Sequence, residues 1–338
     1  MGSSPRQTVQ QMIRGFELTQ AVRAAAELRL PDLLAGGPRS VAELAAATDA
    51  QPALLRRLLR LLASMGVLAE VEPGMFGLTP AGETLRDEPG SLRAAALAYG
   101  ALGPRAWGEL TNVVRTGRTG FELAFGVRDW EYLAQHPHEG ALFNAWMTAG
   151  SQAQAEAVVA AYEFPATGTV VDIAGGHGTL LAAVLRARPG LRGVLFDAPH
   201  VVAGARSVLE GTGVADRCEV VGGDFFQSVP KGGDLYMMKR ILHDWDDARA
   251  AAILRTCRRA MGERSTLLVI DRVLPPAITA ASTESFDACR ADLMMMVWTG
   301  GVERTAEEFG TLFETAGFRV ARILATATPL SVIEAHTV

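Results

Sequence analysis

One histidine stands where it could take part in proton transfer. His243 lies in the segment 239–245, which directly follows an apolar, strand-like run at residues 234–238. An imidazole with its ordinary pKa of about 6.5 is largely neutral at pH 7 and can accept a proton from a hydroxyl group. A single histidine is more often structural than catalytic, so its place in the fold must decide between the two roles.

A glycine-rich turn follows a second strand-like run. Residues 169–174 lead into Gly175-Gly176-His177-Gly178, after which a helix-like segment begins. Glycines let the backbone approach a ligand closely, and the first turn of a helix offers free amides. Asp197 ends the next strand-like run, where a carboxylate can accept hydrogen bonds from both hydroxyls of a ribose. Together these residues predict a nucleotide site.

The pattern favours S-adenosylmethionine over a nicotinamide dinucleotide, which stays as the alternative. The dinucleotide fingerprint G-x-G-x-x-G lacks its third glycine, because Leu181 stands there. Asp172 places a carboxylate just before the turn, which disfavours a pyrophosphate but suits a sulfonium and an ammonium group. Asp224 ends a third strand-like run and precedes Phe225 and Phe226, whose rings could pack on adenine.

The elements that must position these residues alternate between strand and helix. Apolar runs at 169–174, 193–196, 218–221, 234–238 and 265–270 are separated by helix-like segments near 179–188, 200–211, 246–261 and 305–316. This alternation predicts a parallel α/β sheet whose ligands bind at the carboxyl ends of the strands. Residues 318–325 and 331–335 predict a terminal antiparallel hairpin.

The first part of the chain is predicted to be mainly helical. A capping box at Ser40–Glu43, a second helix ending near Gly66, and strands at 67–71 and 75–79 give a winged-helix pattern. The second helix is expected to place these residues on one face: Leu54, Leu55, Leu58, Leu61, Leu62 and Met65. It also carries Arg56, Arg57 and Arg60, so a DNA-binding role stays open as a minor alternative. The net charge of −5 argues against nucleic-acid binding.

Length and composition indicate a globular protein of more than one domain. The chain has 338 residues, of which 49% are hydrophobic and 20% charged. We expect a winged-helix-like domain at 1–100, a helical linker region at 101–165 that contributes to the substrate pocket, and a catalytic domain at 166–338. Residues 1–6 lack a signal-peptide pattern, no apolar run is long enough for a membrane helix, and the three cysteines are far apart. The expectation is a cytoplasmic protein without membrane contact.

Five segments in order carry a family resemblance. Residues 172–178, 196–201, 223–226, 239–245 and 300–305 together resemble the caffeate-type small-molecule O-methyltransferases, including bacterial natural-product members. The resemblance covers nearly the whole chain. It implies a Rossmann-like class I methyltransferase sheet, a winged-helix-like dimerisation domain and a homodimer. It also implies contacts to the methyl donor from Gly175, Asp197, Asp224, Phe225 and Lys239, to which the glycine-turn pattern adds Asp172 and Gly178.

The same resemblance assigns roles around His243. It implies that His243 is the general base and that Asp271 and Glu303 flank it. It further implies that the helix containing Met294–Trp298 lines the acceptor pocket. The helical segment that precedes the glycine-rich turn adds further apolar and polar candidates. The predicted acceptor contacts are therefore Phe143, Asn144, Met147, Met294 and Trp298.

The sequence departs from the family pattern at three positions. Ala174 stands where glycine is usual, Asp271 where glutamate is frequent, and Trp298 where a smaller or polar residue is common. Asp271 is one methylene shorter than glutamate, which puts its hydrogen bond to His243 in doubt. Trp298 is expected to change the shape of the acceptor pocket.

The predicted activity is S-adenosylmethionine-dependent O-methylation of a small aromatic or polyketide-like metabolite, with S-adenosylhomocysteine as the product. Asp246 and Asp247 are interpreted as the cap and first turn of a helix, so no metal is expected. Two alternatives stay open. One is a donor-binding relative that performs hydroxylation or N-methylation, and the other is a ligand-sensing winged-helix regulator.

Overall fold

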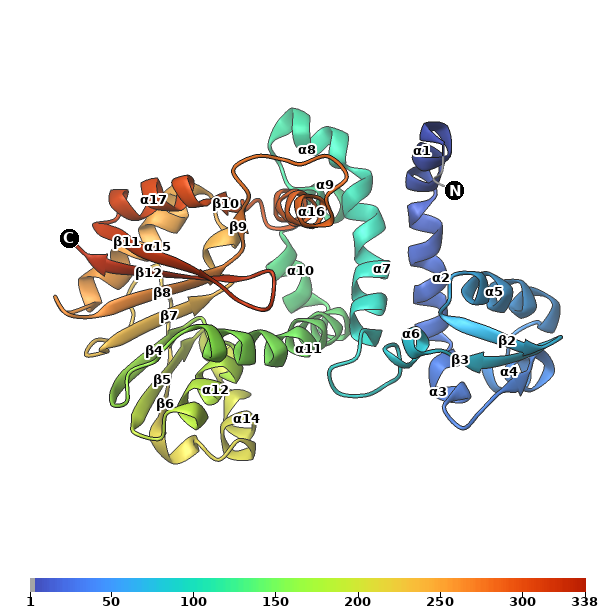
Figure 1. Ribbon diagram of the computed structural model, residues 1–338, viewed down its shortest axis with the longest axis horizontal. Coiled ribbons are helices and arrows are strands. Elements are labelled where there is room, and N and C mark those ends of the chain that lie inside the picture. Colours follow the sequence, from blue (N-terminus) through green and yellow to red (C-terminus); the bar gives the residue numbers. More distant parts are fainter. Residues whose placement is uncertain (1–3) are drawn as a thin grey trace. The chain divides into compact units, whose positions relative to one another are not determined.

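The computed structural model describes residues 4–338, which form two compact units (Figure 1). The first unit comprises residues 4–109 and 124–150, and the second comprises 110–123 and 151–338. This division does not test the domain boundaries predicted at residues 100 and 165, which stay predictions. Residues 1–3, part of the segment inspected for a signal peptide, lie outside the described part. Among residues 4–338, no helix is long and apolar enough to cross a membrane.

The first unit is helical apart from a small sheet. Ser40 caps α4 with the reciprocal Glu43 bond predicted from the sequence. The strands β2 and β3 form the predicted hairpin, and β1 pairs with β3. The elements of this part are α1 (Pro5–Ile13), α2 (Gly15–Glu27), α3 (Leu30–Leu34), β1 (Arg39–Ser40), α4 (Val41–Thr48), α5 (Pro52–Ser64), β2 (Leu68–Glu72), β3 (Met75–Leu78), α6 (Pro80–Glu83), α7 (Arg93–Gly108), α10 (Asp129–Gln135) and the start of α11 (Pro137–Ala161).

Only part of the apolar face predicted for α5 is buried. Leu55, Leu59 and Leu62 are buried, whereas Leu54 and Leu61 are 55% and 39% exposed. Residues spaced by three and four share one helical stripe, and this helix offers two adjacent leucine stripes of which only one meets the core. The predicted apolar face of this helix is therefore buried only in part, because Leu54 and Leu61 stay exposed at its edge.

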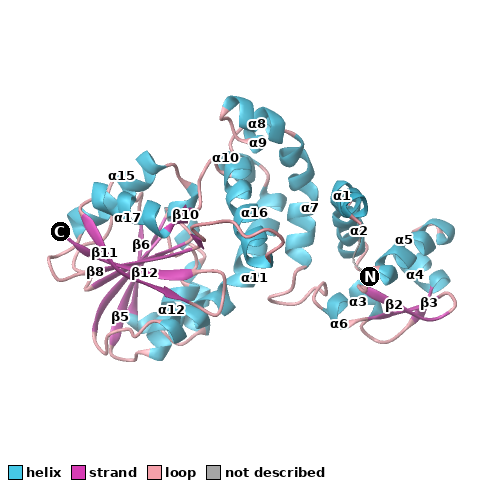
Figure 2. Cartoon of the chain, turned by 45° about the horizontal axis from the view of Figure 1, so that its top comes forward, coloured by secondary structure: helices cyan, strands magenta, loops and turns pink. Residues whose placement is uncertain are grey.

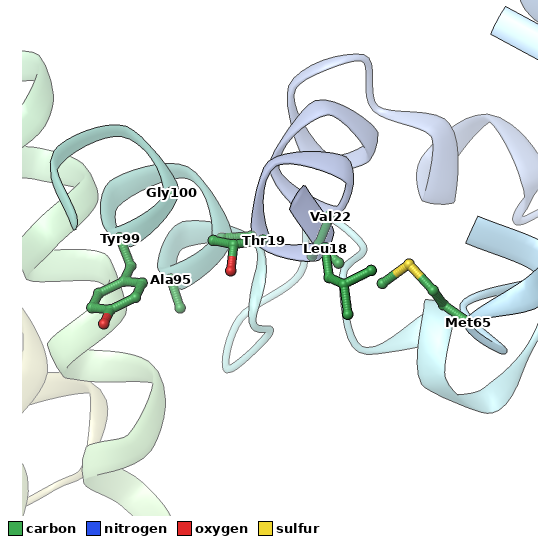
Figure 3. Close-up of a pocket in the computed structure, with 8 residues that line it drawn as sticks. Leu18, Thr19, Val22, Met65, Ala95, Tyr99 and Gly100 are labelled. Carbon is green, nitrogen blue, oxygen red and sulfur yellow. The ribbon is translucent and has the colours of Figure 1, made fainter. Parts of the chain in front are cut away.

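A shallow pocket opens on the first unit beside α2, α7 and the residue after α5. Figure 3 shows Leu18 from α2, Met65 after α5, and Tyr99 from α7 around it. Helices α2 and α7 are in close contact here, since a Cβ on Gly100 would lie 2.9 Å from Cβ of Arg23. The carbonyl of Gly100 also accepts a hydrogen bond of 2.9 Å from the Gln20 side chain.

The second unit is built on a seven-stranded sheet in the order β11-β12-β8-β7-β4-β5-β6. The five strands from β8 to β6 are parallel, and β12 and β11 join antiparallel at one edge. The predicted parallel sheet with a terminal antiparallel hairpin is confirmed. Its strands are β4 (Gly168–Ile173), β5 (Leu191–Asp197), β6 (Cys218–Gly222), β7 (Leu235–Lys239), β8 (Thr266–Asp271), β11 (Phe318–Ala325) and β12 (Ser331–Thr337).

Helices cover both faces of this sheet (Figure 2). One face packs against α15 (Asp247–Ala260) and α17 (Ala306–Thr315), and the other against α12 (Thr179–Ala187), α14 (Ala205–Gly211) and the end of α11. Alternate residues of β4 show the division, because Val171 enters the first core and Val170 the second. The remaining elements are α8 (Leu110–Thr116), α9 (Gly120–Phe125), α13 (Pro199–Val202), β9 (Val273–Leu274), α16 (Thr283–Trp298) and β10 (Arg304–Thr305).

The order of the strands fixes where a ligand can bind. After β4 the chain adds β5 and β6 on one side, and then returns to place β7 and β8 on the other. The carboxyl ends of β4 and β7 therefore meet at the point where the strand order reverses, the usual ligand position in such sheets. The glycine-rich turn follows β4, and His243 follows β7, so the fold brings the two predicted sites to one edge.

Candidate active site

The turn after β4 has the tight backbone that its glycines predict. Ala174, Gly176 and Gly178 have φ values of 54°, 61° and 84°, in the left-handed region. Glycine adopts this conformation freely, but for an alanine it costs about 1–2 kcal/mol. Ala174 therefore adopts the backbone conformation of the turn at the cost of local strain. The O-methyltransferases that the sequence resembles usually have glycine at this position.

Asp172, at the end of β4, is a buried carboxylate without a satisfying partner. Neither of its oxygens makes a hydrogen bond to a side chain or to the backbone within bonding geometry, and the nearby Leu181 amide stabilises its charged form only weakly. Burial raises the pKa of Asp172 to about 7, although Lys239 acts in the opposite direction. Such an acid would be stabilised by a bound cation.

Asp197 connects the glycine-rich turn to the next strand. One of its carboxylate oxygens accepts a 2.8 Å hydrogen bond from the Gly176 amide, and the other accepts a 2.6 Å bond from the Ala198 amide. An ionised carboxylate has about four acceptor positions, so both oxygens keep capacity for the hydroxyls of a ribose.

Lys239, the last residue of β7, faces the same edge. Its Nζ donates to Oε1 of Gln154 at 2.9 Å and to Oγ of Ser151 at 3.4 Å. Burial lowers the pKa of Lys239 to about 8, against the opposing effect of Asp172. Two side chains of α11 thus fix the position of the ammonium, whose positive charge lowers the pKa of Asp172.

Asp224 and Phe225 lie after β6, two strands away from the switch point. Asp224 is exposed and accepts a 2.9 Å hydrogen bond from the Phe226 amide. The ring of Phe225 is partly buried, with its centroid 4.9 Å from that of Phe226 and 6.2 Å from that of Trp245. The aromatic pair is therefore anchored at the sheet edge, and its predicted contact with adenine stays a prediction.

These residues fit the methyl donor predicted from the sequence. Asp172 offers an unmet acid to a cationic group, the turn through Gly175 and Gly178 allows close backbone approach, and Asp197 retains acceptor capacity. No group of three or more His, Cys, Asp or Glu side chains within residues 4–338 is arranged to hold a metal ion.

His243 lies in a short 3₁₀ turn, Leu242–Asp244, directly after β7. Its ring is buried, and Nδ1 is 3.0 Å from Oε1 of Glu303, a residue 60 positions away in the chain. Since a carboxylate can only accept, Nδ1 carries the proton and Nε2 is the nitrogen left to act on a ligand. On the Nε2 side, Oδ1 of Asp244 is 3.7 Å away.

The acids around His243 change its protonation relative to the sequence-based expectation. Burial by itself lowers the pKa of the imidazole, but Asp244, Asp271 and Glu303 outweigh it and raise the pKa to about 9. The ligand-free protein therefore holds an imidazolium at pH 7, and not the neutral imidazole expected from the ordinary value. A base in this state becomes competent only after it loses a proton.

The two predicted flanking acids are not equivalent in the structure. Glu303 makes the hydrogen bond to His243, and its side chain is 4% exposed. Asp271 is fully buried, yet neither of its oxygens makes a hydrogen bond. Burial raises the pKa of Asp271 to about 7. The doubt about its shorter side chain is thus matched by the geometry.

The loop that carries Glu303 is attached to the His243 turn through its backbone. The Val302 amide donates a 2.9 Å hydrogen bond to the His243 carbonyl. Gly301 leaves no room for a side chain, because a Cβ there would collide with the same carbonyl oxygen. Gly301 and Val302 were not among the residues predicted for the site, although the paired glycines at 300–301 were the available signal.

The predicted acceptor residues fall in both units. Trp298 is buried on α16 and packs against Phe121, with ring centroids 5.3 Å apart, and Met294 lies one turn earlier and is half-buried. Phe143, Asn144 and Met147 lie on α11 in the first unit, where Phe143 packs edge-on against neighbouring tryptophans. The structure brings His243 and Glu303 together within the second unit. The three α11 residues belong to the first unit, and their contact with an acceptor stays a prediction.

The residues interpreted as a helix cap have that role. Asp246 caps α15 by accepting a 2.8 Å hydrogen bond from the Arg249 amide, and Asp247 lies in the first turn. Asp247 also binds Arg304, an interaction that the sequence did not predict.

The turn after β4 offers a direct test of donor binding. A Cβ on Gly175 would lie 2.5 Å from Oδ2 of Asp172 and 2.6 Å from Cδ1 of Leu195, so Gly175→Ala must displace the turn. We expect the dissociation constant for S-adenosylmethionine, measured by calorimetry, to rise at least about tenfold, which corresponds to about 1.4 kcal/mol. Gly211→Ala is the matched control, since its Cβ would meet nothing within 4 Å. Equal donor affinity in the two variants would contradict this account of the turn.

Comparisons with known proteins match both parts of the chain. The family model of the O-methyltransferase domain matches residues 107–319, and that of the O-methyltransferase dimerisation domain matches residues 10–87. The chain is 46% identical to the phenazine O-methyltransferase PhzM of Lysobacter antibioticus, over 97% of this chain and 95% of that protein.

Solved structures agree with this match. The crystal structure of LaPhzM is similar with a TM-score of 0.93 and 45% identity, covering 99% of this chain and all of that one. The O-methyltransferase NcsB1 from neocarzinostatin biosynthesis, in complex with S-adenosylmethionine and 2-hydroxy-5-methyl naphthoic acid, is similar with a TM-score of 0.82 and 34% identity over 95% and 96% of the two chains. A further relative, 37% identical over 92% of this chain and 89% of its own, is the 8-amino-8-demethylriboflavin N,N-dimethyltransferase of Streptomyces davaonensis.

Proposed function

The chain belongs to the O-methyltransferase family and is an S-adenosylmethionine-dependent O-methyltransferase, and from this premise we propose that it methylates a hydroxyl of a small aromatic or polyketide-like metabolite with His243 as the general base. The observation that carries the proposal is the buried contact of 3.0 Å between Nδ1 of His243 and Oε1 of Glu303 at the carboxyl end of β7.

The chemistry explains why a buried base is needed. S-adenosylmethionine supplies a methyl group already activated by its sulfonium leaving group, and S-adenosylhomocysteine is left after transfer. A phenol has a pKa of about 10 and is mostly neutral at pH 7, so the protein must remove the proton of the acceptor. Nε2 of His243 accepts that proton as the acceptor oxygen attacks, and Glu303 stabilises the resulting imidazolium through Nδ1. Holding the reacting oxygen in line supplies the remaining acceleration.

The donor site in this proposal is formed by residues of the second unit. Asp172 faces the cationic part of the donor, Asp197 accepts from its ribose, and Lys239 balances the buried acid. The turn through Gly175 and Gly178 provides close backbone approach. Asp224 and Phe225 extend the site towards the adenine.

Trp298 is proposed to determine the shape of the acceptor pocket. Trp298→Ala is expected to shift the preference towards larger acceptors, while donor affinity stays within about twofold. Removing a buried tryptophan destabilises a core by about 3–5 kcal/mol, so Trp298→Leu, which keeps more apolar volume, serves as a second variant. Relative kcat/KM values across acceptors of graded size provide the measurement. If both variants ranked the acceptors by kcat/KM in the same order as the unmodified protein, this role for Trp298 would be contradicted.

The reaction class is tested with the purified full-length chain. The protein is incubated with methyl-labelled S-adenosylmethionine and a panel of phenols, aromatic amines and compounds with both groups, and the products are analysed by mass spectrometry. We expect one labelled methyl on the oxygen of a phenolic acceptor. A gain of oxygen, or methyl transfer only to amines, would replace the proposal with one of the two alternative enzyme activities.

N-methylation is retained as the second candidate because of the similarity to the N,N-dimethyltransferase. A neutral amine is a good nucleophile and does not have to lose a proton before it attacks, whereas a neutral phenol is a weak nucleophile. The buried base at His243 therefore favours a hydroxyl acceptor.

The assembly follows from the other matched domain. The dimerisation domain at residues 10–87 indicates a homodimer. Helices α1 and α2 expose apolar side chains in this region, and we propose that they contribute to the dimer contact. The exposed residues are Val9, Met12, Ile13, Phe16 and Leu18. We propose a small-molecule acceptor as the other partner, with no role for nucleic acid or membrane.

A further inference from the structure

Arg304 is a buried charged side chain that the proposed reaction does not use. It is 1% exposed, and it is the residue directly after Glu303. A guanidinium in such a place loses its hydration, and it is stable only where fixed acceptors replace the water. The positions of those acceptors therefore indicate what the side chain does.

The acceptors of Arg304 lie on both sides of His243. Nη1 donates to the Leu242 carbonyl at 3.0 Å, and Nη2 donates to the Trp245 carbonyl at 2.9 Å. The first of these residues precedes His243 and the second follows it by two positions. The planar guanidinium thus holds the 3₁₀ turn that carries the imidazole from both of its ends.

The same guanidinium also binds the loop that carries Glu303. Nη1 donates to the Val302 carbonyl at 3.2 Å, one residue before Glu303. One side chain therefore contacts the segments that bear the two members of the His243–Glu303 pair. The backbone hydrogen bond from Val302 to the His243 carbonyl adds a second link between these segments.

The charge partner of Arg304 is too exposed to explain its burial. Asp247 accepts a hydrogen bond of 2.9 Å from Nε, and its Oδ1 lies 2.8 Å from Nη2 as an ion pair, but its side chain is 81% exposed. An ion pair with such an exposed acid is weakened by solvent. The three backbone carbonyls, of which that of Leu242 is fully buried, are the acceptors that replace water around the guanidinium.

The backbone of Arg304 is also linked to the segment that follows Asp271, the second flanking acid. Arg304 pairs with Val273, and Thr305 pairs with Leu274, in the parallel strands β10 and β9. Asp271 lies two residues before β9, and Glu303 lies one residue before β10. The position of Arg304 is therefore coupled to Asp271 and Glu303, two of the three acids that raise the pKa of His243.

We propose that Arg304 is a positioning residue that sets the distance between Nδ1 of His243 and the Glu303 carboxylate, an inference that rests on the proposed role of His243 as the base. It touches neither donor nor acceptor in this proposal. Its effect is transmitted through the carbonyls of Leu242, Trp245 and Val302.

The test compares two variants of Arg304 with a variant of an exposed, ion-paired arginine elsewhere in the second unit. Arg304→Lys keeps the charge, but a single ammonium cannot reach carbonyls at both ends of the turn. Arg304→Met removes the charge while filling the space, and its exposed partner Asp247 is not left as a buried unpaired ion. The control is Arg322→Lys, at an arginine whose guanidinium is 2.8 Å from the Glu334 carboxylate on the β11–β12 hairpin. Folding is checked by circular dichroism and thermal unfolding.

We expect kcat to fall at least about tenfold in both Arg304 variants, with donor affinity within twofold of the unmodified protein and Arg322→Lys fully active. A longer bond to Glu303 also weakens an interaction that raises the pKa of His243, so the inflection in the pH profile of kcat/KM should move to lower pH. An unchanged kcat, an unmoved inflection, or failure of both variants to fold would overturn the proposal. If His243→Ala itself remained active, the proposed function would fail instead, so the two failures are distinguishable.

Discussion

Replacing His243 by alanine is expected to lower kcat by about 10³-fold, within the range of 10² to 10⁴ that general base catalysis contributes. The imidazole is buried, and its Nε2 is left for a ligand after Nδ1 has bonded to Glu303. Donor affinity should stay within about twofold, because the predicted donor contacts lie at the ends of β4, β5 and β7 and in the turns after β4 and β6, and do not include His243. Turnover with labelled donor and calorimetric binding provide the two measurements.

Phenols of different acidity make this test more specific for the loss of a base. A phenol with electron-withdrawing substituents is already ionised at pH 8, so it needs no base, and the loss in His243→Ala should shrink towards tenfold or less. His336→Ala is the control, since that histidine is 48% exposed and pairs with Glu334 on β12. The base assignment would be wrong if His243→Ala kept most of its activity on a weakly acidic phenol, or if the loss were equal for all acceptors.

Glu303→Gln is expected to have the second largest effect, a loss of about 10–100-fold in kcat. The amide oxygen can still accept from Nδ1, but the charge that stabilises the imidazolium is gone. Glu303 raises the pKa of His243 both by its hydrogen bond and by its charge, so its removal should also move the inflection of the pH profile to lower pH.

Asp271→Asn is the matched variant, because it neutralises the other flanking acid without breaking a hydrogen bond. Its loss should be under about fivefold, although the inflection should again move to lower pH, since Asp271 also raises the pKa of His243. A larger loss in Asp271→Asn than in Glu303→Gln would reverse the proposed order of the two acids. It would mean that the acid without a hydrogen bond in the ligand-free protein engages His243 once the ligands have bound.

The sheet was predictable from the sequence because its signals are local. Each strand is a short apolar run bounded by turn residues, and β4, β7 and β8 appear within one or two residues of their predicted limits. The order of alternating strands and helices then places the glycine-rich turn and His243 at one edge without any further information.

The buried face of α5 was not predictable in the same way. Its leucines form two adjacent stripes, one through Leu54 and Leu61 and one through Leu55 and Leu62, and helical periodicity fits both. The choice depends on what packs against the helix, which only the tertiary structure shows.

The site was predictable in its residue types but not in its contacts. Glu303 and Asp271 come from separate segments, and only the structure shows that the first bonds to His243 and the second does not. The raised pKa of His243 depends on three acids meeting in a buried place, so the ordinary value was a poor guide. The role of Arg304 was not predictable, because a single arginine after a glycine-containing turn gives no sign that its guanidinium binds three backbone carbonyls.

The central claim, that His243 is the base and must lose a proton before it acts, is tested most directly by the pH dependence of kcat/KM at saturating donor. A base with a pKa raised to about 9 in the ligand-free protein is competent only in its neutral form, so activity should rise with pH and level off above the pKa. The bound donor is a cation and should bring the inflection to about 9 or lower.

The profile is recorded with several phenols of different acidity, so that ionisation of the acceptor is separated from that of the protein. We predict a rising profile with one inflection that is shared by the weakly acidic phenols and is absent in His243→Ala. A profile that falls between pH 6 and 9, or one whose every inflection follows the pKa of the phenol, would contradict the account.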